Sequence, residues 1–80
     1  MANNEPLKFE IINQLGIISA GKSGWTYEFN LVSWNGVEPK YDIRKWQQHT
    51  KAGKGVTLTE SELRKLKELI ETEIEYLDTE

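Results

Sequence analysis

The sequence contains no cysteine and only one histidine, His49, among its 80 residues. Disulfides and cysteine-ligated metal sites are therefore excluded, and a lone histidine in a polar segment does not make a metal site. No apolar run approaches the roughly 20 residues that cross a bilayer. The first residues also lack the basic start and apolar core of a signal peptide. We therefore expect a cytoplasmic protein with no membrane partner, and association with the nucleoid is left open.

Motifs of catalysis are missing as well. There is no cysteine nucleophile and no Ser/His/Asp set with a supporting motif, and the glycines of residues 53–57, GKGVT, lack the spacing of a P-loop. We expect a non-enzymatic protein that uses no cofactor and no metal.

Eighty residues predict one domain, residues 1–80, with an ordered core at about 7–77. A chain of this size has a small core and marginal stability as a monomer. Without disulfide or metal staples, dimerisation is the remaining common way to bury more surface.

Charge is distributed unevenly along the chain. The net charge is −3, but residues 1–57 carry +2 and residues 58–80 carry −5. Residues 33–59 combine two tryptophans with five cations: Trp34, Trp46, Lys40, Arg44, Lys45, Lys51 and Lys54. Phosphates attract cations and unstacked bases stack on flat rings, so this segment indicates a nucleic-acid surface. An ordinary solvated sheet face is the alternative.

Alternating residues predict the strands. Residues 7–18 indicate a strand that bends near 13–16, and residues 25–34 alternate cleanly between apolar and polar. This phase places Trp25 and its partners Tyr27, Phe29 and Leu31 on the core face, and Trp34 on the opposite, outer face.

Asn35-Gly36 predicts a hairpin leading to a strand at residues 40–46. If Tyr41 and Ile43 face the core, then Lys40, Arg44 and Trp46 share the outer face with Trp34, whereas Lys45 does not. That parity requires one extra residue, and hence an irregularity, near residues 37–39.

Residues 47–55 read as a polar loop and 56–58 as a short strand. Thr59 and Glu62 form a capping box for a helix that ends near Tyr76 or Leu77. The helix carries one apolar stripe, formed by Leu63, Leu66, Ile70, Ile74 and Leu77. The stripe covers the sheet, meets a second protomer, or does both.

Three segments together resemble the single-stranded-DNA-binding domain of the positive cofactor four family of transcriptional coactivators, and above all its small bacterial relatives. They are Trp34 with Gly36, the run YDIRKW at residues 41–46, and GKGVTLT at residues 53–59. The resemblance covers about residues 7–75. It implies an α+β fold, in which a four-stranded curved antiparallel sheet is followed by one C-terminal helix. It also implies a homodimer that binds single strands on its curved sheets, with the helices at the interface.

The chain departs from the eukaryotic pattern in its hairpin, which is one residue longer and has Asn35 and Val37 in place of lysines. The serine- and lysine-rich regulatory segment of the eukaryotic coactivator is absent, so a coactivator role does not follow.

Sequence-tolerant binding of single-stranded DNA is therefore the predicted function, serving transcription regulation, replication or repair. The predicted binding residues are Trp34, Lys40, Arg44, Trp46, Lys51, Lys54 and Lys22, and the predicted dimer interface is Leu66, Ile70, Ile74 and Leu77. Trp25 is assigned to the core, with contact to the ligand as the lesser alternative. The alternatives are a protein-interaction module that docks acidic partners, and binding of single-stranded RNA.

Overall fold

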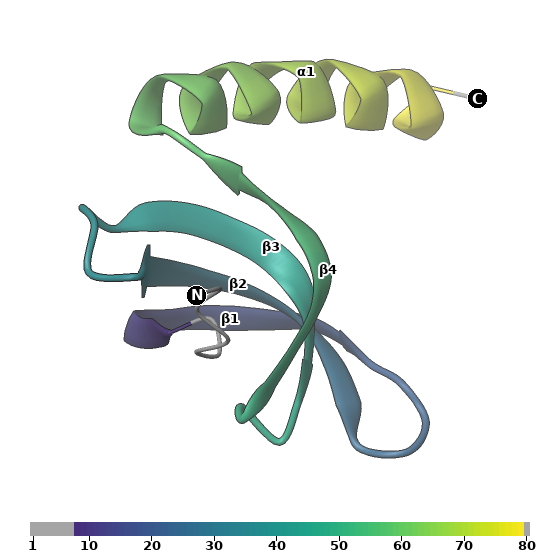
Figure 1. The fold of residues 1–80 in the computed structure, drawn as a ribbon. Helices are drawn as coiled ribbons and strands as arrows, with labels where there is room; N and C mark the ends of the chain where they lie inside the picture. The colour runs from purple at the N-terminus through teal and green to yellow at the C-terminus, as the bar shows by residue number, and fades with distance from the viewer. Residues whose placement is uncertain (1–7, 80) are drawn as a thin grey trace.

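A computed structural model describes residues 8–79. Four strands precede one helix: β1 (Phe9–Ala20), β2 (Trp25–Trp34), β3 (Lys40–Gln47), β4 (Lys51–Leu58) and α1 (Glu60–Asp78). The strands form one antiparallel sheet in the order β1-β2-β3-β4 (Figure 1). The predicted order of four strands and a C-terminal helix is confirmed, although residue 7, the expected first residue of the first strand, lies outside the described part.

The hairpin between β2 and β3 has the predicted geometry. Asn35 and Gly36 both adopt positive φ, at 52° and 77°, where asparagine and glycine are tolerated best. Asn30 pairs with Asp42 rather than with Tyr41, so the longer connection preserves the shared face as parity required. The amide of Val37 donates to the carbonyl of Trp34 at 3.0 Å and closes the turn.

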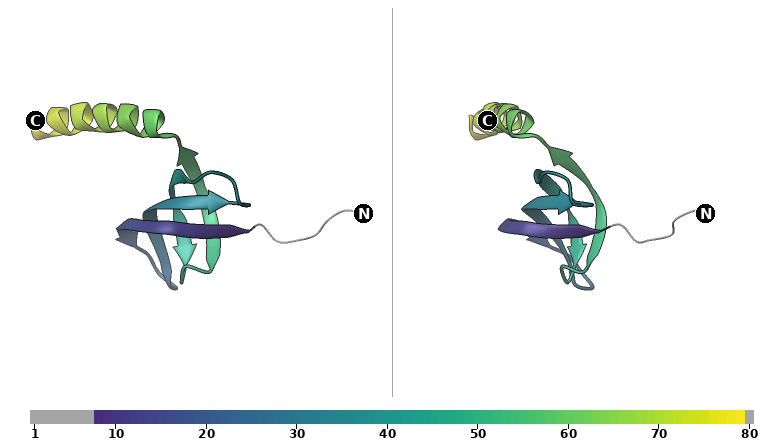
Figure 2. Two further views of the ribbon diagram at one scale, coloured as in Figure 1. Left: turned by 90° about the vertical axis from the view of Figure 1, so that its left-hand side faces the viewer. Right: turned by 60° about the vertical axis from the view of Figure 1, so that its left-hand side comes forward.

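Strand β1 is irregular along its whole length. Its pairing with β2 slips between Ile11 and Asn13, between Gln14 and Gly16, and between Ile17 and Ser19. The bend predicted near residues 13–16 is therefore confirmed as one of three register shifts. Repeated bulges increase strand twist, and β1 runs across the other strands in the left view of Figure 2.

Strand β4 is longer than predicted. It begins at Lys51, not at residue 56, because Gln48 and His49 take left-handed conformations and turn the chain within three residues. Its glycines favour a loop on propensity alone, but the ladder to β3 holds them in a strand. Propensity is a weak guide where a partner strand supplies the hydrogen bonds.

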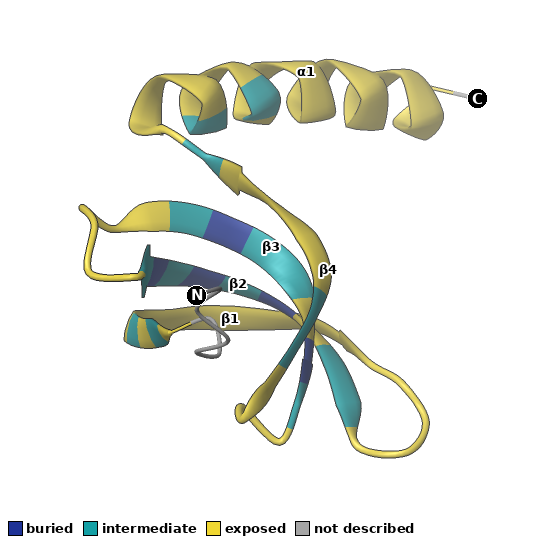
Figure 3. Cartoon of the chain, in the orientation of Figure 1, coloured by how far each residue is buried: buried dark blue, intermediate teal, exposed yellow. Residues whose placement is uncertain are grey.

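The faces of the sheet have the predicted membership but the opposite burial. We call the side with Glu28, Asn30, Val32, Asp42 and Trp46 the inner face; these five residues are buried (Figure 3). From here on we call the other side of the sheet the outer face, although the sequence had predicted it as the core side. It carries residues that are all half-buried or exposed: Trp25, Tyr27, Phe29, Leu31, Tyr41 and Ile43. The prediction that Trp46 faces solvent is wrong, whereas Lys40, predicted on the same face, is exposed.

Curvature explains the reversal. The ring of Phe9 on β1 lies 4.9 Å from the ring of Trp46 on β3, although β2 separates the two strands. The sheet thus curls until β1 closes over the inner face, which becomes the interior. Parity assigns residues to faces, but it does not show toward which face a sheet curls.

Helix α1 has the predicted capping box at Thr59 and Glu62 and ends at Asp78. It does not cover the sheet. None of its residues is buried, and it extends away from the strands after touching only β3 and β4 (Figures 1 and 2). Of its apolar stripe only Leu63 and Leu66 are half-buried, so the alternative in which the stripe covers the sheet of its own chain is wrong.

Gly55 on β4 pairs with Arg44 on β3 and lies directly against the backbone of that strand. A Cβ atom at this position would overlap the Cβ of Arg44 and the carbonyl oxygen of Ile43, and would lie 2.7 Å from the Cα of Arg44. Only a residue without a side chain allows this approach.

We predict that Gly55→Ala lowers the free energy of unfolding by about 1–3 kcal/mol or more, because the backbone must shift to admit the methyl group. Gly16→Ala is the matched control, since nothing lies within 4 Å of the atom it adds. Urea denaturation of both variants measures the difference. Equal midpoints for the two would contradict the close approach.

Candidate nucleic-acid interface

A buried carboxylate orients the first candidate residues. Asp42 on β3 accepts a hydrogen bond from Trp34 Nε1 at 3.2 Å on one oxygen and from Arg44 Nε at 2.7 Å on the other. The guanidinium carbon of Arg44 then lies 4.6 Å from the centre of the Trp34 ring. A cation over a tryptophan face contributes about 0.5–1 kcal/mol at an exposed site and more when desolvated. One carboxylate thus fixes a ring and a cation together.

A hollow of about 310 Å³ lies beside this pair. It is lined by Trp34, Val37, Glu38, Lys40, Arg44 and Thr57, and we call it the Trp34 site. Trp34 is half-buried, and Lys40 is exposed. Three of the predicted binding residues therefore meet in one place, with Glu38 as the single opposing charge among the lining residues described.

Trp46 does not reach this surface. Its side chain is 0% exposed, and its ring lies below that of Trp34, with centroids 6.1 Å apart and planes inclined by 13°. Phe9 packs against both rings. Trp46 therefore supports Trp34 from beneath, and the prediction of an exposed Trp46 platform is corrected by the curl of the sheet.

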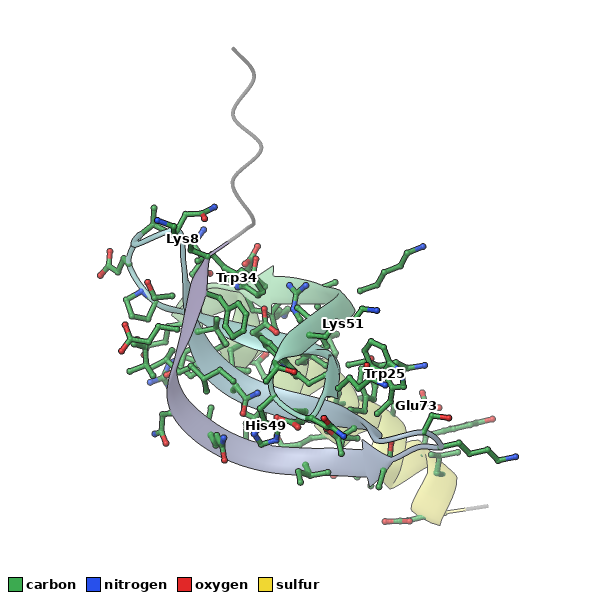
Figure 4. The ribbon with its side chains drawn as sticks, turned by 60° about the horizontal axis from the view of Figure 1, so that its bottom comes forward. Lys8, Trp25, Trp34, His49, Lys51 and Glu73 are labelled. Atoms are coloured by element: carbon green, nitrogen blue, oxygen red, sulfur yellow. The ribbon has the colours of Figure 1, made fainter. Side chains whose placement is uncertain are left out.

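The remaining predicted cations lie elsewhere. Lys22 and Lys54 line a second hollow together with Trp25 and Lys45, and Lys51 is exposed at the start of β4. Figure 4 shows Trp25 and Trp34 toward opposite ends of the curled sheet. Sequence reasoning placed Trp25 in the core and gave Lys45 no role. The shared parity of Trp25, Tyr27 and Lys45 was the signal that could have joined them.

The predicted interface residues of α1 follow one side of the helix. Leu66 is half-buried, and Ile70, Ile74 and Leu77 are exposed, at 47%, 49% and 57% of their full area. No helix among the described residues is long and apolar enough to cross a membrane. Within residues 8–79 no cluster of three or more potential metal ligands is found.

Comparison with known proteins agrees with this architecture. Residues 22–69, which include the three segments that carry the resemblance up to the helix, match the family described as transcriptional coactivator p15 (PC4). The chain belongs to this family. It is also similar to an uncharacterized protein of Treponema pallidum (strain Nichols), with 41% identity over 68 aligned residues. The alignment covers 84% of this chain and 80% of that protein.

In this member of the PC4 family, a second polar cluster joins β1, β2 and the turn before β4. Glu28 on β2 accepts hydrogen bonds from Thr26 and, at 3.0 Å, from Asn30. His49, from the turn before β4, places Nε2 2.9 Å from Glu28 and Nδ1 3.0 Å from the amide of Gln14 on β1. The ring of His49 therefore bridges Glu28 on β2 and Gln14 on β1.

The environment of Glu28 changes its acidity. Burial by itself raises the pKa of this carboxyl group, but the hydrogen bonds from Thr26 and Asn30 and the nearby His49 outweigh burial. The pKa of Glu28 is thereby lowered from its ordinary value of 4.5. Folding favours the ionised form, so the resulting stabilisation is present above pH 4.5 and is lost as the pH falls through the folded-state value.

We predict that Glu28→Gln destabilises the fold by about 1–3 kcal/mol at neutral pH, because buried donors lose their charged acceptor. The variant should also lose part of the decrease in stability that the wild type shows below about pH 4.5. Urea unfolding at a series of pH values measures both effects. Glu38→Gln, a change at an exposed carboxylate, is the control. An identical acid profile for wild type and Glu28→Gln would contradict the assignment.

Proposed function

We propose that this protein binds single-stranded DNA without strong sequence preference, with the Trp34 site as its contact surface. The observation that carries the proposal is the pairing of the Trp34 ring with Arg44 over one buried carboxylate, beside the exposed Lys40. The Trp34 ring and the guanidinium plane that lies over it together offer a flat surface to a base, while Lys40 and Arg44 attract the adjoining phosphates. The family is known for single-stranded DNA binding and coactivator roles, which supports this assignment.

Rigidity of the site favours binding of a flexible strand. Arg44 is held by Asp42 at 2.7 Å and by the carbonyl of Gly53 at 3.1 Å, and its side chain is only 15% exposed. The protein therefore loses little side-chain entropy when a ligand arrives. Lys40 remains free to follow the backbone of different sequences, which suits sequence-tolerant binding.

We predict that Trp34→Ala weakens binding to oligothymidine by about 1–3 kcal/mol. Lys40→Gln should reduce the dependence of log affinity on log salt concentration by about 0.7, the effect of one lost phosphate contact on a single strand. Fluorescence anisotropy across a salt series measures both quantities. Lys65→Gln on α1, which is not among the residues that line the Trp34 site, is the control.

Competition in the same assay separates the alternatives. An unlabelled single-stranded DNA should displace the probe better than duplex DNA does. Stronger displacement by RNA of the same sequence would reassign the ligand to RNA. Wild-type protein that binds an acidic polypeptide but not oligothymidine would instead make the site a protein-docking surface.

We further propose that the protein is a homodimer joined through α1. The helix projects from the sheet with Ile70, Ile74 and Leu77 exposed along one side, and a solitary helix in water gains most of its stability from packing of such a side. A second copy offers the same stripe by symmetry, which is how two-fold dimers are built. The proposed dimer carries two Trp34 sites.

Ile74→Asp should convert the dimer into monomers, because the interface would bury an unpaired charge. Thr72→Asp introduces the same charge on the opposite side of the helix and should leave the dimer intact. Light scattering at micromolar concentration distinguishes the two species. A monomeric wild type with full affinity for DNA would end the proposal of a dimer while leaving the Trp34 site standing.

A further inference from the structure

A second hollow lies on the outer face, at the end of β2 opposite to Trp34. It has a volume of about 610 Å³ and is lined by Lys22, Trp25, Tyr27, Lys45 and Lys54, with small residues between them. We call it the Trp25 pocket. Three cations and two aromatic rings converge here, and none of the described residues that line the pocket carries a carboxylate. This charge pattern favours an anionic ligand that has flat groups.

The backbone of Trp25 is held by two hydrogen bonds, and its ring packs against Gly53. The amide of Gly21 donates to the carbonyl of Trp25 at 2.7 Å, and the amide of Trp25 donates to the carbonyl of Lys22 at 3.3 Å. The ring packs on Gly53, where an added Cβ would lie 3.0 Å from Trp25 Cζ3. Tyr27 next to it remains 38% exposed. Because Trp25 packs against Gly53, its side chain should lose little conformational entropy when a ligand binds beside the exposed Tyr27.

Gly53 links the Trp25 pocket to the Trp34 site. Its carbonyl accepts the hydrogen bond from Arg44 Nη1 at 3.1 Å on one side, and Trp25 packs against it on the other. It belongs to β4, an edge strand of the described sheet. In the run Gly53-Lys54-Gly55 only Lys54 has a side chain, so few side-chain atoms stand between the two sites along this edge of the sheet. The one side chain present there is a cation.

We infer that a single strand of DNA bound at the Trp34 site continues across the β4 edge at Gly53–Gly55 and into the Trp25 pocket. There a base stacks on Trp25 or Tyr27, and phosphates contact Lys22, Lys45 and Lys54. The inference rests on the proposed function. It adds a second aromatic contact on the other face of the sheet and lengthens the strand that one protomer holds.

The length of the oligonucleotide tests the inference. Oligothymidines of about four and about 16 nucleotides span the range of site sizes found for single-strand-binding domains. The short probe reaches one site only, whereas the long probe reaches both. Binding of each probe to the whole chain of residues 1–80 is measured by fluorescence anisotropy in dilute salt, where phosphate contacts are strongest.

Trp25→Leu should weaken binding of the long probe about tenfold, the loss of one stacked base, and should leave the short probe unchanged. Lys45→Gln keeps the ring and should lower the salt slope for the long probe by about 0.7. Trp34→Ala should weaken both probes. Lys65→Gln, on the exposed surface of α1, controls for the loss of a lysine. Because Lys45 is exposed, its variant remains informative if Trp25→Leu fails to fold.

Other outcomes overturn the inference. If Trp25→Leu and Lys45→Gln both bind the long probe as the wild type does, while Trp34→Ala does not, the pocket takes no part and the proposed function stands. Equal weakening of both probes by Trp25→Leu would mean that the ring acts only through the fold. Wild-type protein that binds neither probe would remove the proposed function, and this inference with it.

Discussion

Asp42 has a carboxylate that is buried and fully engaged, with Trp34 on one oxygen and Arg44 on the other. Arg44 in turn binds the carbonyl of Gly53, so a single charged group joins the end of β2, the middle of β3 and the edge strand β4. Each element that approaches the Trp34 site is therefore positioned by the same short chain of contacts. Gly55 then permits β4 to lie close enough for that chain to close.

A buried ion pair of this kind is weak support for stability, because desolvation of both charges offsets much of their attraction. Its value here is geometric. Asp42 accepts hydrogen bonds from Trp34 at 3.2 Å and from Arg44 at 2.7 Å, two side chains that would otherwise be mobile. These bonds hold the guanidinium of Arg44 over the Trp34 ring. The second cluster, around Glu28 and His49, does the same for β1 and the turn before β4. The inner face is thus held by polar contacts as much as by its few apolar residues.

Sequence reasoning succeeded where the determining interactions are local. The capping box at Thr59 and the positive φ of Asn35 and Gly36 depend on neighbouring residues, and both are confirmed. Parity along β2 and β3 also gave the correct membership of each face. The direction in which the sheet curls depends on three register shifts in β1 and on the contact of Phe9 with Trp46. Neither can be read from the alternation of apolar and polar residues. For that reason Trp46 was assigned to solvent and Trp25 to the core.

The separation of charge along the chain explains how an acidic protein can present a surface for DNA. The cations of the Trp34 site and the Trp25 pocket lie on the sheet, whereas most of the acids lie on a helix that extends away from it. The longest dimension of the structure is 56 Å, several times the screening length of about 8 Å at physiological salt. Acids on the far turns of α1 therefore add little repulsion at the sheet, and the local positive field there is set by its own lysines and Arg44. The projecting helix thus keeps its negative charge away from the candidate surface, and Ile70, Ile74 and Leu77 on its apolar side remain exposed.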